Sequence, residues 1–139
     1  MYVVDASVWV SRFILSDEYH TQSRQWLEQR IRDRTPLFYP TIVLAEVAGA
    51  VARKTRRESD GLAAVRVIRS LSGTRLFTTD IEAAEVAANV AAAFRLRGMD
   101  AIYIALAMRL SFPLVTWDGE QSRRVTAPIV ALTPPQAPR

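Results

Sequence analysis

Residues 1–10, MYVVDASVWV, determine how the start of this chain folds. Tyr2, Val3 and Val4 form a short apolar run, and Asp5 and Ser7 follow it at once. Such a run predicts a buried strand, and an Asp or Ser directly after it predicts the N-terminus of a helix. Asp5 still needs an explanation, because an ionised carboxylate without a partner costs several kcal/mol to bury.

Three further acids interrupt or end apolar runs. Glu46 lies in TIVLAEVAGAVA (41–52), Asp100 directly precedes AIYIALAM (101–108), and Asp118 follows LVTW (114–117). Taken singly, each of these acids is explained as well by a helix cap or a satisfied buried pair as by a functional role. The remaining acids that we considered have polar neighbours or helix-start positions, where solvation or capping accounts for them; they are Asp17, Glu18, Glu28, Asp33, Glu58, Asp60, Glu82 and Glu85.

Composition limits the classes of protein to consider. The 139 residues suit one domain, half of them are hydrophobic, and 23% are charged, as in folded globular proteins. Cysteine is absent, which excludes disulfides and thiolate metal sites. We expect no signal peptide and no membrane span, and therefore a cytoplasmic protein. The net charge of +4 would favour a polyanion but decides little alone.

Short apolar runs alternate with segments of helical periodicity along the chain. The predicted strands are the initial YVVD (2–5), TPLFYP (35–40), TRLFT (74–78), FPLVTWD (112–118) and APIVAL (127–132). This alternation predicts an α/β fold: a mostly parallel central sheet of about five short strands with helices on both faces. We assign residues 1–132 to this single domain and residues 133–139 to a Pro-rich tail.

The helices between these strands are predicted from apolar spacing and from capping residues. The first part of the chain shows this spacing at Trp9, Phe13, Trp26, Leu27 and Ile31, and a helix is predicted over 41–54. A later helix has the stripe Leu62, Val65, Ile68 and Leu71 and ends at Gly73. The next starts with a capping box of Thr79 and Glu82, has the stripe Val86, Val90 and Phe94, and ends at Gly98. The last begins at Asp100 and has Ile102, Leu106 and Leu110 on one side.

The four unusual acids are predicted to meet at one edge of the sheet. In open parallel sheets, binding sites form outside the carboxyl ends of the strands. Asp5 and Asp118 end predicted strands, and Glu46 and Asp100 lie early in the predicted helices. Carboxylates held close repel one another unless a cation lies among them.

The available ligands favour a hard cation. With no cysteine and one histidine, His20, which we interpret as a surface residue near a helix start, the ligands are oxygens, which suit Mg²⁺ or Mn²⁺ better than Zn²⁺. A haloacid-dehalogenase site is disfavoured because Ser7 stands where it needs a second Asp. A response-regulator site is disfavoured because the only lysine is Lys54.

Four segments of the chain resemble the motifs of PIN-domain nucleases. They are VVDASV (3–8), AEV (45–47), RGMDAIYIALA (97–107) and LVTWD (114–118). Their order and spacing and the length of the chain most resemble the VapC-type ribonuclease toxins of toxin–antitoxin pairs. The resemblance covers about residues 1–132.

The resemblance implies a set of site residues. Asp5, Glu46, Asp100 and Asp118 would form an acidic metal site for one or two Mg²⁺ ions, with Mn²⁺ as an alternative. Ser7 would support Asp5 by hydrogen bonding, and Thr116 would do the same near Asp118. Glu120 is a candidate outer ligand, although a helix N-terminal acid is the preferred interpretation. Trp117 either covers the sheet edge or stacks on a base.

The resemblance also implies an activity and partners. The expected activity is that of a Mg²⁺-dependent endoribonuclease toxin of a type II system, in which a metal-activated water cuts RNA to leave a 5′ phosphate and a 3′ hydroxyl. A homodimer is expected, with a cognate antitoxin whose C-terminal segment lies over the site. The alternatives are a housekeeping PIN nuclease acting on RNA precursors or DNA, and a catalytically silent binding module. RNA would approach over arginines, for which the candidates are Arg12, Arg53, Arg56, Arg57, Arg95, Arg97, Arg123 and Arg124.

Overall fold

One parallel sheet organises the protein. The computed structural model describes residues 1–126 and 128–137, and its five strands lie in the order β3-β2-β1-β4-β5. Every neighbouring pair is parallel, with Val3 opposite both Phe38 and Leu114. The strands are β1 (Tyr2–Val4), β2 (Leu37–Pro40), β3 (Thr74–Phe77), β4 (Leu114–Val115) and β5 (Ala131–Leu132). The predicted parallel α/β fold is confirmed.

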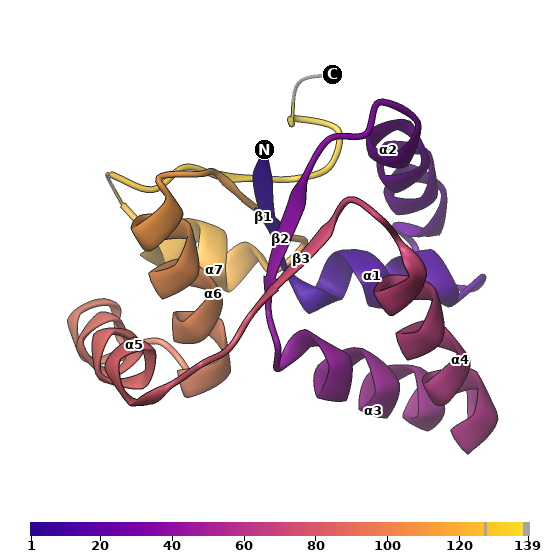
Figure 1. Cartoon of the computed structure of the whole chain (residues 1–139), viewed down its shortest axis with the longest axis horizontal. Coiled ribbons are helices and arrows are strands. Elements are labelled where there is room, and N and C mark those ends of the chain that lie inside the picture. Colours follow the sequence, from indigo (N-terminus) through magenta and orange to yellow (C-terminus); the bar gives the residue numbers. More distant parts are fainter. Residues whose placement is uncertain (127, 138–139) are drawn as a thin grey trace.

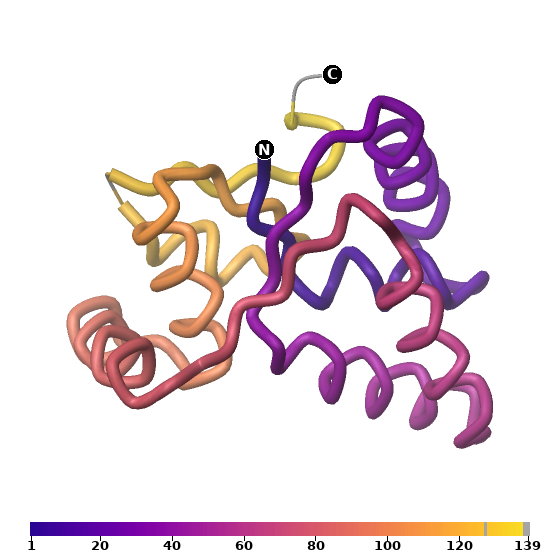
Figure 2. The backbone as a smooth tube through the Cα atoms, viewed as in Figure 1, coloured from indigo at the N-terminus to yellow at the C-terminus, as the bar shows by residue number. Residues whose placement is uncertain are grey.

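Helices cover both faces of the sheet, as predicted. In Figure 1, α1 to α4 lie to the right of the strands and α5 to α7 lie to the left. The tube in Figure 2 shows how the chain crosses from the first group to the second along β3. The helices are α1 (Ala6–Phe13), α2 (His20–Arg32), α3 (Val43–Thr55), α4 (Glu58–Ser70), α5 (Ile81–Phe94), α6 (Gly98–Leu110) and α7 (Gly119–Arg124).

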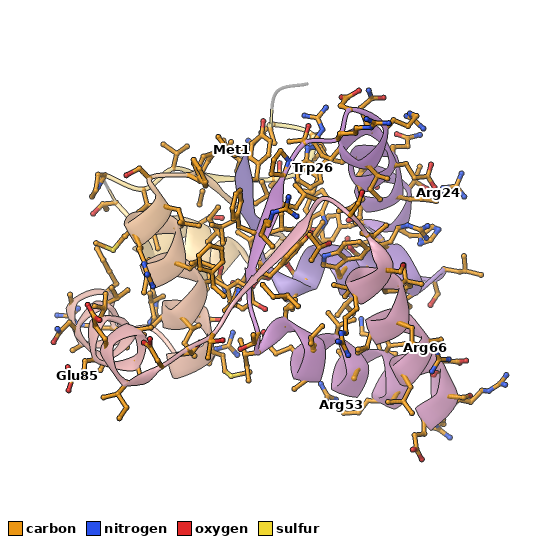
Figure 3. The ribbon with its side chains drawn as sticks, viewed as in Figure 1. Met1, Arg24, Trp26, Arg53, Arg66 and Glu85 are labelled. Atoms are coloured by element: carbon orange, nitrogen blue, oxygen red, sulfur yellow. The ribbon has the colours of Figure 1, made fainter. Side chains whose placement is uncertain are left out.

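The core lies where β1 and β4 meet the surrounding helices. Val3, Val4, Leu114 and Val115 are fully buried, as continuous apolar runs in a parallel sheet should be. Figure 3 shows the side chains that fill the space between the central strands and the helices. Helix α6 is enclosed on most sides, since Ala101 and the run 103–107 are buried. This packing fixes the direction in which the first turn of α6 points.

The predicted ends of α5 differ from those in the structure. The N-cap is Asp80, whose side chain accepts a hydrogen bond from the Ala83 backbone N–H at 2.9 Å, so the capping box at Thr79 was placed one residue early. Helix α5 ends at Phe94, because Arg95 adopts the left-handed conformation with φ 55°. Gly98 does not end this helix; it is the first residue of α6.

The predicted apolar stripe of α4 is also partly wrong. Leu62 is 47% exposed, and the buried positions are Gly61, Ala64 and Ile68. A Cβ at Gly61 would overlap the carbonyl oxygen of Ala48 in α3, so close backbone approach turns the face with Gly61 inward. The helix ends at Ser70, and the predicted stop at Gly73 lies in the turn before β3.

Two other predicted elements are shorter or shifted. Val86 in the predicted α5 stripe is 42% exposed, whereas Ala87 and Val90 are buried. The last strand consists of residues 131 and 132, and position 127 of the predicted strand 127–132 lies outside the described residues. In the tail, Ala137 is buried, and Pro134 and Pro135 lie beside α2. The boundary between domain and tail at residue 132 stays a prediction.

Candidate metal and active site

The fold brings the four acids to the carboxyl edge of the sheet. Asp5 directly follows β1 and is the N-cap of α1, while Glu46 and Asp100 lie in the first turns of α3 and α6. The predicted strand 112–118 placed Asp118 at the end of β4. In the structure, Asp118 lies outside this strand. It lies three residues beyond Val115, where it caps α7 and accepts hydrogen bonds from the backbone N–H groups of the next turn at 2.8 and 3.2 Å.

Asp5 is the most enclosed of the four acids, with 6% of its surface exposed. Its Oδ2 accepts hydrogen bonds from the backbone N–H of Ser7 at 3.0 Å and from the hydroxyl of Thr116 at 3.2 Å. Its Oδ1 lies 3.4 Å from Nε2 of Gln121. Burial raises the pKa of Asp5, and these donors offset part of that shift.

Thr116 and Ser7 connect the ends of β1 and β4. The Thr116 hydroxyl donates to Asp5 and accepts the backbone N–H of Asp118 at 2.9 Å. The Ser7 hydroxyl accepts the backbone N–H of Trp117 at 3.1 Å and lies 3.5 Å from the Thr116 hydroxyl. One buried hydroxyl thus holds two of the acids in a fixed relation.

Glu46 is held by a tyrosine that the sequence did not single out. The hydroxyl of Tyr103 in α6 donates to Oε2 of Glu46 at 2.5 Å. Burial raises the pKa of Glu46, the Tyr103 bond lowers it, and the negative charges of Asp5 and Asp100 raise it further. The pKa of Tyr103 is itself raised, chiefly by burial, so the phenol stays protonated and remains a donor.

Gln121 and Arg97 link the acids to one another. Nε2 of Gln121, whose residue is 1% exposed, donates to Asp100 Oδ1 at 2.9 Å as well as approaching Asp5. Arg97 donates from Nε to Asp100 Oδ2 at 3.0 Å and from Nη2 to Asp118 Oδ2 at 3.3 Å. The spacing of Arg97 and Asp100 could have indicated an ion pair. No local pattern marks Gln121, since its contacts join residues far apart in the sequence.

The donor set fits a hard cation in chemistry. All four side chains offer carboxylate oxygens, the ligands that Mg²⁺ and Mn²⁺ prefer. Positively polarised N–H groups of Gln121 and Arg97 lie between these oxygens, where a cation would be favoured for the same electrostatic reason. Within residues 1–126 and 128–137, no group of three His, Cys, Asp or Glu side chains is arranged to hold a metal ion. An ion bound to Asp100 Oδ2 and Asp118 Oδ2 would have to displace Arg97, which donates to both of these oxygens.

Three other predicted residues lie near this edge or beside it. Glu120 is an exposed acid in the first turn of α7, and it pairs with Arg124. Trp117 stacks on Tyr19 with ring centroids 4.0 Å apart, and its Nε1 donates to Ser23 at 2.7 Å, so one face of the indole is already covered. His20 is the half-buried first residue of α2, with Nδ1 3.0 Å from the Ser11 carbonyl oxygen.

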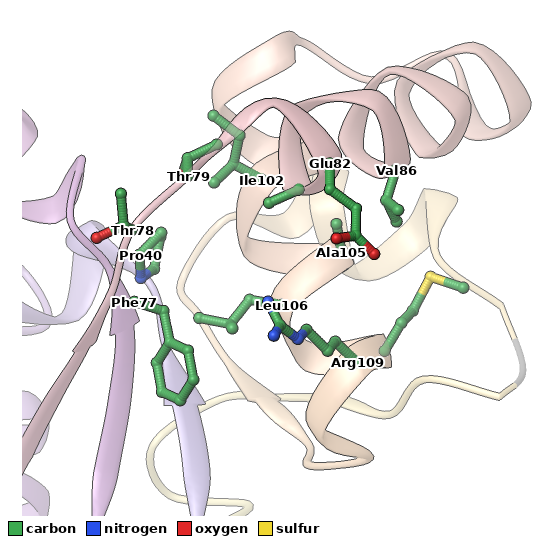
Figure 4. A pocket seen from close by; sticks show the side chains of 12 residues that line it. Pro40, Phe77, Thr78, Thr79, Glu82, Val86, Ile102, Ala105, Leu106 and Arg109 are labelled. Carbon is green, nitrogen blue, oxygen red and sulfur yellow. The ribbon is translucent and has the colours of Figure 1, made fainter.

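A separate cleft lies between the ends of β2 and β3 and the helices α5 and α6 (Figure 4). It has a volume of about 400 Å³, and Phe77, Val86 and Leu106 contribute apolar walls. Glu82 and Arg109 also line it, whereas none of the four acids does. The cleft is therefore a different site from the cluster of four acids.

A parallel sheet with carboxylates gathered where β1 and β4 end defines an α/β domain with an acidic site at the carboxyl edge. The model of the PIN domain family matches residues 2–126, and the chain belongs to that family. No curated protein matches the sequence.

Solved structures share the fold at low sequence identity. VapC20 of Mycobacterium tuberculosis, described as a sarcin–ricin loop cleaving toxin, has a TM-score of 0.78 at 16% identity, over 94% of this chain and 99% of that one. VapBC2 from Rickettsia felis, bound to a DNA fragment from its promoter, has a TM-score of 0.71 at 12% identity over 95% and 97%. A toxin–antitoxin complex from Klebsiella pneumoniae has 0.68 at 20% over 96% and 98%.

Among the residues that the structure describes, none of the helices combines the length and the apolar character needed to cross a bilayer.

Proposed function

We propose that this protein is a metal-dependent endoribonuclease and the toxin of a type II toxin–antitoxin pair. The observation that supports the proposal best is the meeting of Asp5, Asp100 and Asp118 through Gln121 and Arg97, with Glu46 coupled electrostatically to Asp5 and Asp100. Membership of the PIN domain family and the shared fold of VapC20 support the same activity.

Each acid has a role in this proposal. Asp5, Glu46, Asp100 and Asp118 would hold Mg²⁺ or Mn²⁺, with Glu46 placed on the side of α3. A bound divalent ion supplies a water of lowered pKa and stabilises charge on the phosphate. Thr116 and the backbone N–H of Ser7 keep Asp5 oriented, while Tyr103 keeps Glu46 oriented. The products would be a 5′ phosphate and a 3′ hydroxyl.

The partners follow from the same proposal. The toxin–antitoxin complexes that share the fold support a cognate antitoxin, and we place the protein in the cytoplasm as a homodimer acting on RNA. A housekeeping PIN nuclease would have the same acidic edge but no antitoxin. A neighbouring reading frame that encodes a small DNA-binding protein, and its copurification with this chain, would favour the toxin over the housekeeping enzyme.

Cleavage of RNA is the direct test. We would incubate the protein with structured RNAs, including a sarcin–ricin loop hairpin, in Mg²⁺ or Mn²⁺ and with EDTA. Asp5→Asn keeps the shape of the side chain and removes its charge, and we expect it to lower the rate at least about 100-fold, since it removes a ligand of the catalytic ion. Asp60→Asn in α4 is the matched control and should cleave at the wild-type rate.

The outcomes separate the alternatives. Cleavage that requires the metal and is lost in Asp5→Asn supports the nuclease. No cleavage of any RNA by folded wild-type protein would favour the silent binding module or a PIN nuclease with another substrate, such as DNA. Cleavage that persists both in EDTA and in Asp5→Asn would contradict the metal site.

A further inference from the structure

Arg97 differs from the other arginines near the acidic edge in what it contacts. Its guanidinium bridges Asp100 and Asp118, which come from different helices, through two separate nitrogens. The side chain is 73% exposed, whereas those of Asp100 and Asp118 are 16% and 24% exposed. Arg124, by contrast, is held by Glu120 and by the carbonyl oxygen of Arg95. Arg97 thus covers the two acids from the solvent side.

The backbone of Arg97 is held by α6, whereas its side chain is largely exposed. Arg97 is the N-cap of α6, and the backbone N–H of Ala101 donates to its carbonyl oxygen at 3.0 Å. The buried face of α6 holds this point of the chain against the sheet. The long side chain extends from this anchor into solvent, so it can change rotamer without disturbing the core. Exposed ion pairs of this kind are weak, which makes the contact easy to break.

A divalent ion and the guanidinium would compete for the same carboxylates. Asp100 Oδ2 and Asp118 Oδ2 each accept from Arg97, and each is an oxygen that a hard cation would use. Two positive groups in one place also repel each other. An ion bound by Asp100 and Asp118 would therefore release Arg97 beside the site, still cationic and with its planar donors free.

We propose that the Arg97 side chain covers the acidic site when no metal is bound. Once a metal ion has replaced it on Asp100 and Asp118, the same side chain binds the substrate phosphate. A free guanidinium next to a bound cation is suited to a phosphodiester, because it forms paired hydrogen bonds with phosphate oxygens. The phosphate-binding half of this inference rests on the proposed nuclease function. The competition with metal does not, and it is measurable without any RNA.

The first experiment measures metal binding by calorimetry, with Mn²⁺ as the probe. Arg97→Gln should bind Mn²⁺ about fivefold more tightly than wild type, which corresponds to the loss of the two weak, exposed ion pairs with Asp100 and Asp118. Arg97→Lys, which keeps the charge but not the fork, should fall between them. Arg66→Gln removes an exposed arginine on α4 and leaves Asp100 and Asp118 untouched, so it controls for net charge and should match wild type.

The second experiment measures RNA binding by fluorescence anisotropy with and without Ca²⁺, and a gel checks that the RNA stays intact. We expect Ca²⁺ to strengthen binding by wild type and by Arg66→Gln, and to strengthen it at least about threefold less in Arg97→Gln. If Ca²⁺ strengthens RNA binding equally in wild type and Arg97→Gln while the calorimetric result holds, Arg97 does not bind the substrate phosphate.

The two proposals fail in different ways. Equal Mn²⁺ affinity in wild type and Arg97→Gln would contradict the proposed role of Arg97 and leave the nuclease proposal standing. No Mn²⁺ binding to either protein at millimolar concentration would overturn the metal site, and with it both proposals.

Discussion

The acidic edge has an inner pair, Asp5 and Glu46, and an outer pair, Asp100 and Asp118, and the two pairs are held by different chemistry. Neutral donors hold the inner pair: the Thr116 hydroxyl, the Ser7 backbone N–H and the Tyr103 hydroxyl. The outer pair also has neutral donors, since Gln121 donates to Asp100 and two backbone N–H groups donate to Asp118. In addition, a largely exposed cation, Arg97, bridges these two acids. The contact that salt can screen, and that a bound metal ion could displace, is therefore the Arg97 bridge at the outer pair. A site of this kind keeps its shape on one side and can open on the other.

Removing the hydroxyl shared by both pairs should have the largest effect on stability. Thr116→Val keeps the shape of a fully buried side chain but leaves Asp5 without one donor and the Asp118 N–H without its acceptor. We expect the free energy of unfolding to fall by about 2 kcal/mol, because buried polar groups lose partners. Urea denaturation measures this loss. Thr21→Val, at an exposed position of α2, should change it by less than about 0.5 kcal/mol. Equal effects of the two substitutions would show that Thr116 does not support the inner pair.

The charge of the inner pair should cost stability at neutral pH. Burial raises the pKa of Asp5 above 3.8, so folding favours its protonated form. Protonated Asp5 therefore contributes to the free energy of unfolding in acid, and this contribution is lost as the pH rises through the raised pKa of Asp5. Asp5→Asn should therefore be more stable than wild type by about 1 kcal/mol at pH 7, with the difference shrinking towards pH 4.

Asp118→Asn provides the contrast from the outer pair, since Asp118 is partly exposed and paired with Arg97. It should give no gain in stability at any pH. Thermal melts of the two variants and wild type from pH 4 to pH 8 test both statements. A gain in Asp118→Asn as large as that in Asp5→Asn would remove the distinction between the pairs.

The bridge over the outer pair should give the smallest effect on stability, and one that depends on salt. Because the Arg97 guanidinium is exposed, ions screen its attraction to Asp100 and Asp118. At low ionic strength, Arg97→Gln should lower the melting temperature slightly. At 1 M NaCl, it should lower the melting temperature no more than Arg66→Gln does. A loss that persists in high salt would mean that the bridge acts through packing.

The sequence was enough to predict the parallel α/β fold, because short apolar runs alternate with segments of helical spacing. It was also enough to single out the four acids. Acids within apolar runs are costly, and Asp5, Glu46, Asp100 and Asp118 stand out on that ground alone. The meeting of these acids at one edge follows from the rule for parallel strands. Their roles as metal ligands stay a proposal that the cleavage and calorimetric experiments test.

Other features depended on contacts that no local pattern contains. Gln121 reaches Asp5 across 116 positions of sequence, and Tyr103 reaches Glu46 across 57. The stripe of α4 was misjudged because apolar size suggested Leu62, whereas close approach at Gly61 decides which face turns inward. The stop at Gly98 failed because Arg95 takes the left-handed conformation that glycine usually supplies.

The position of β1 between β2 and β4 has a consequence for protein synthesis. Asp5 is synthesised 111 residues before Thr116 and 116 residues before Gln121, the two later residues that hold it. A nascent chain can pair β1 with β2 and still lack β4 and the first turn of α7. The cluster is therefore completed only after Gln121 has left the ribosome. An activity that depends on the cluster would be silent while the ribosome that makes it is still translating this stretch.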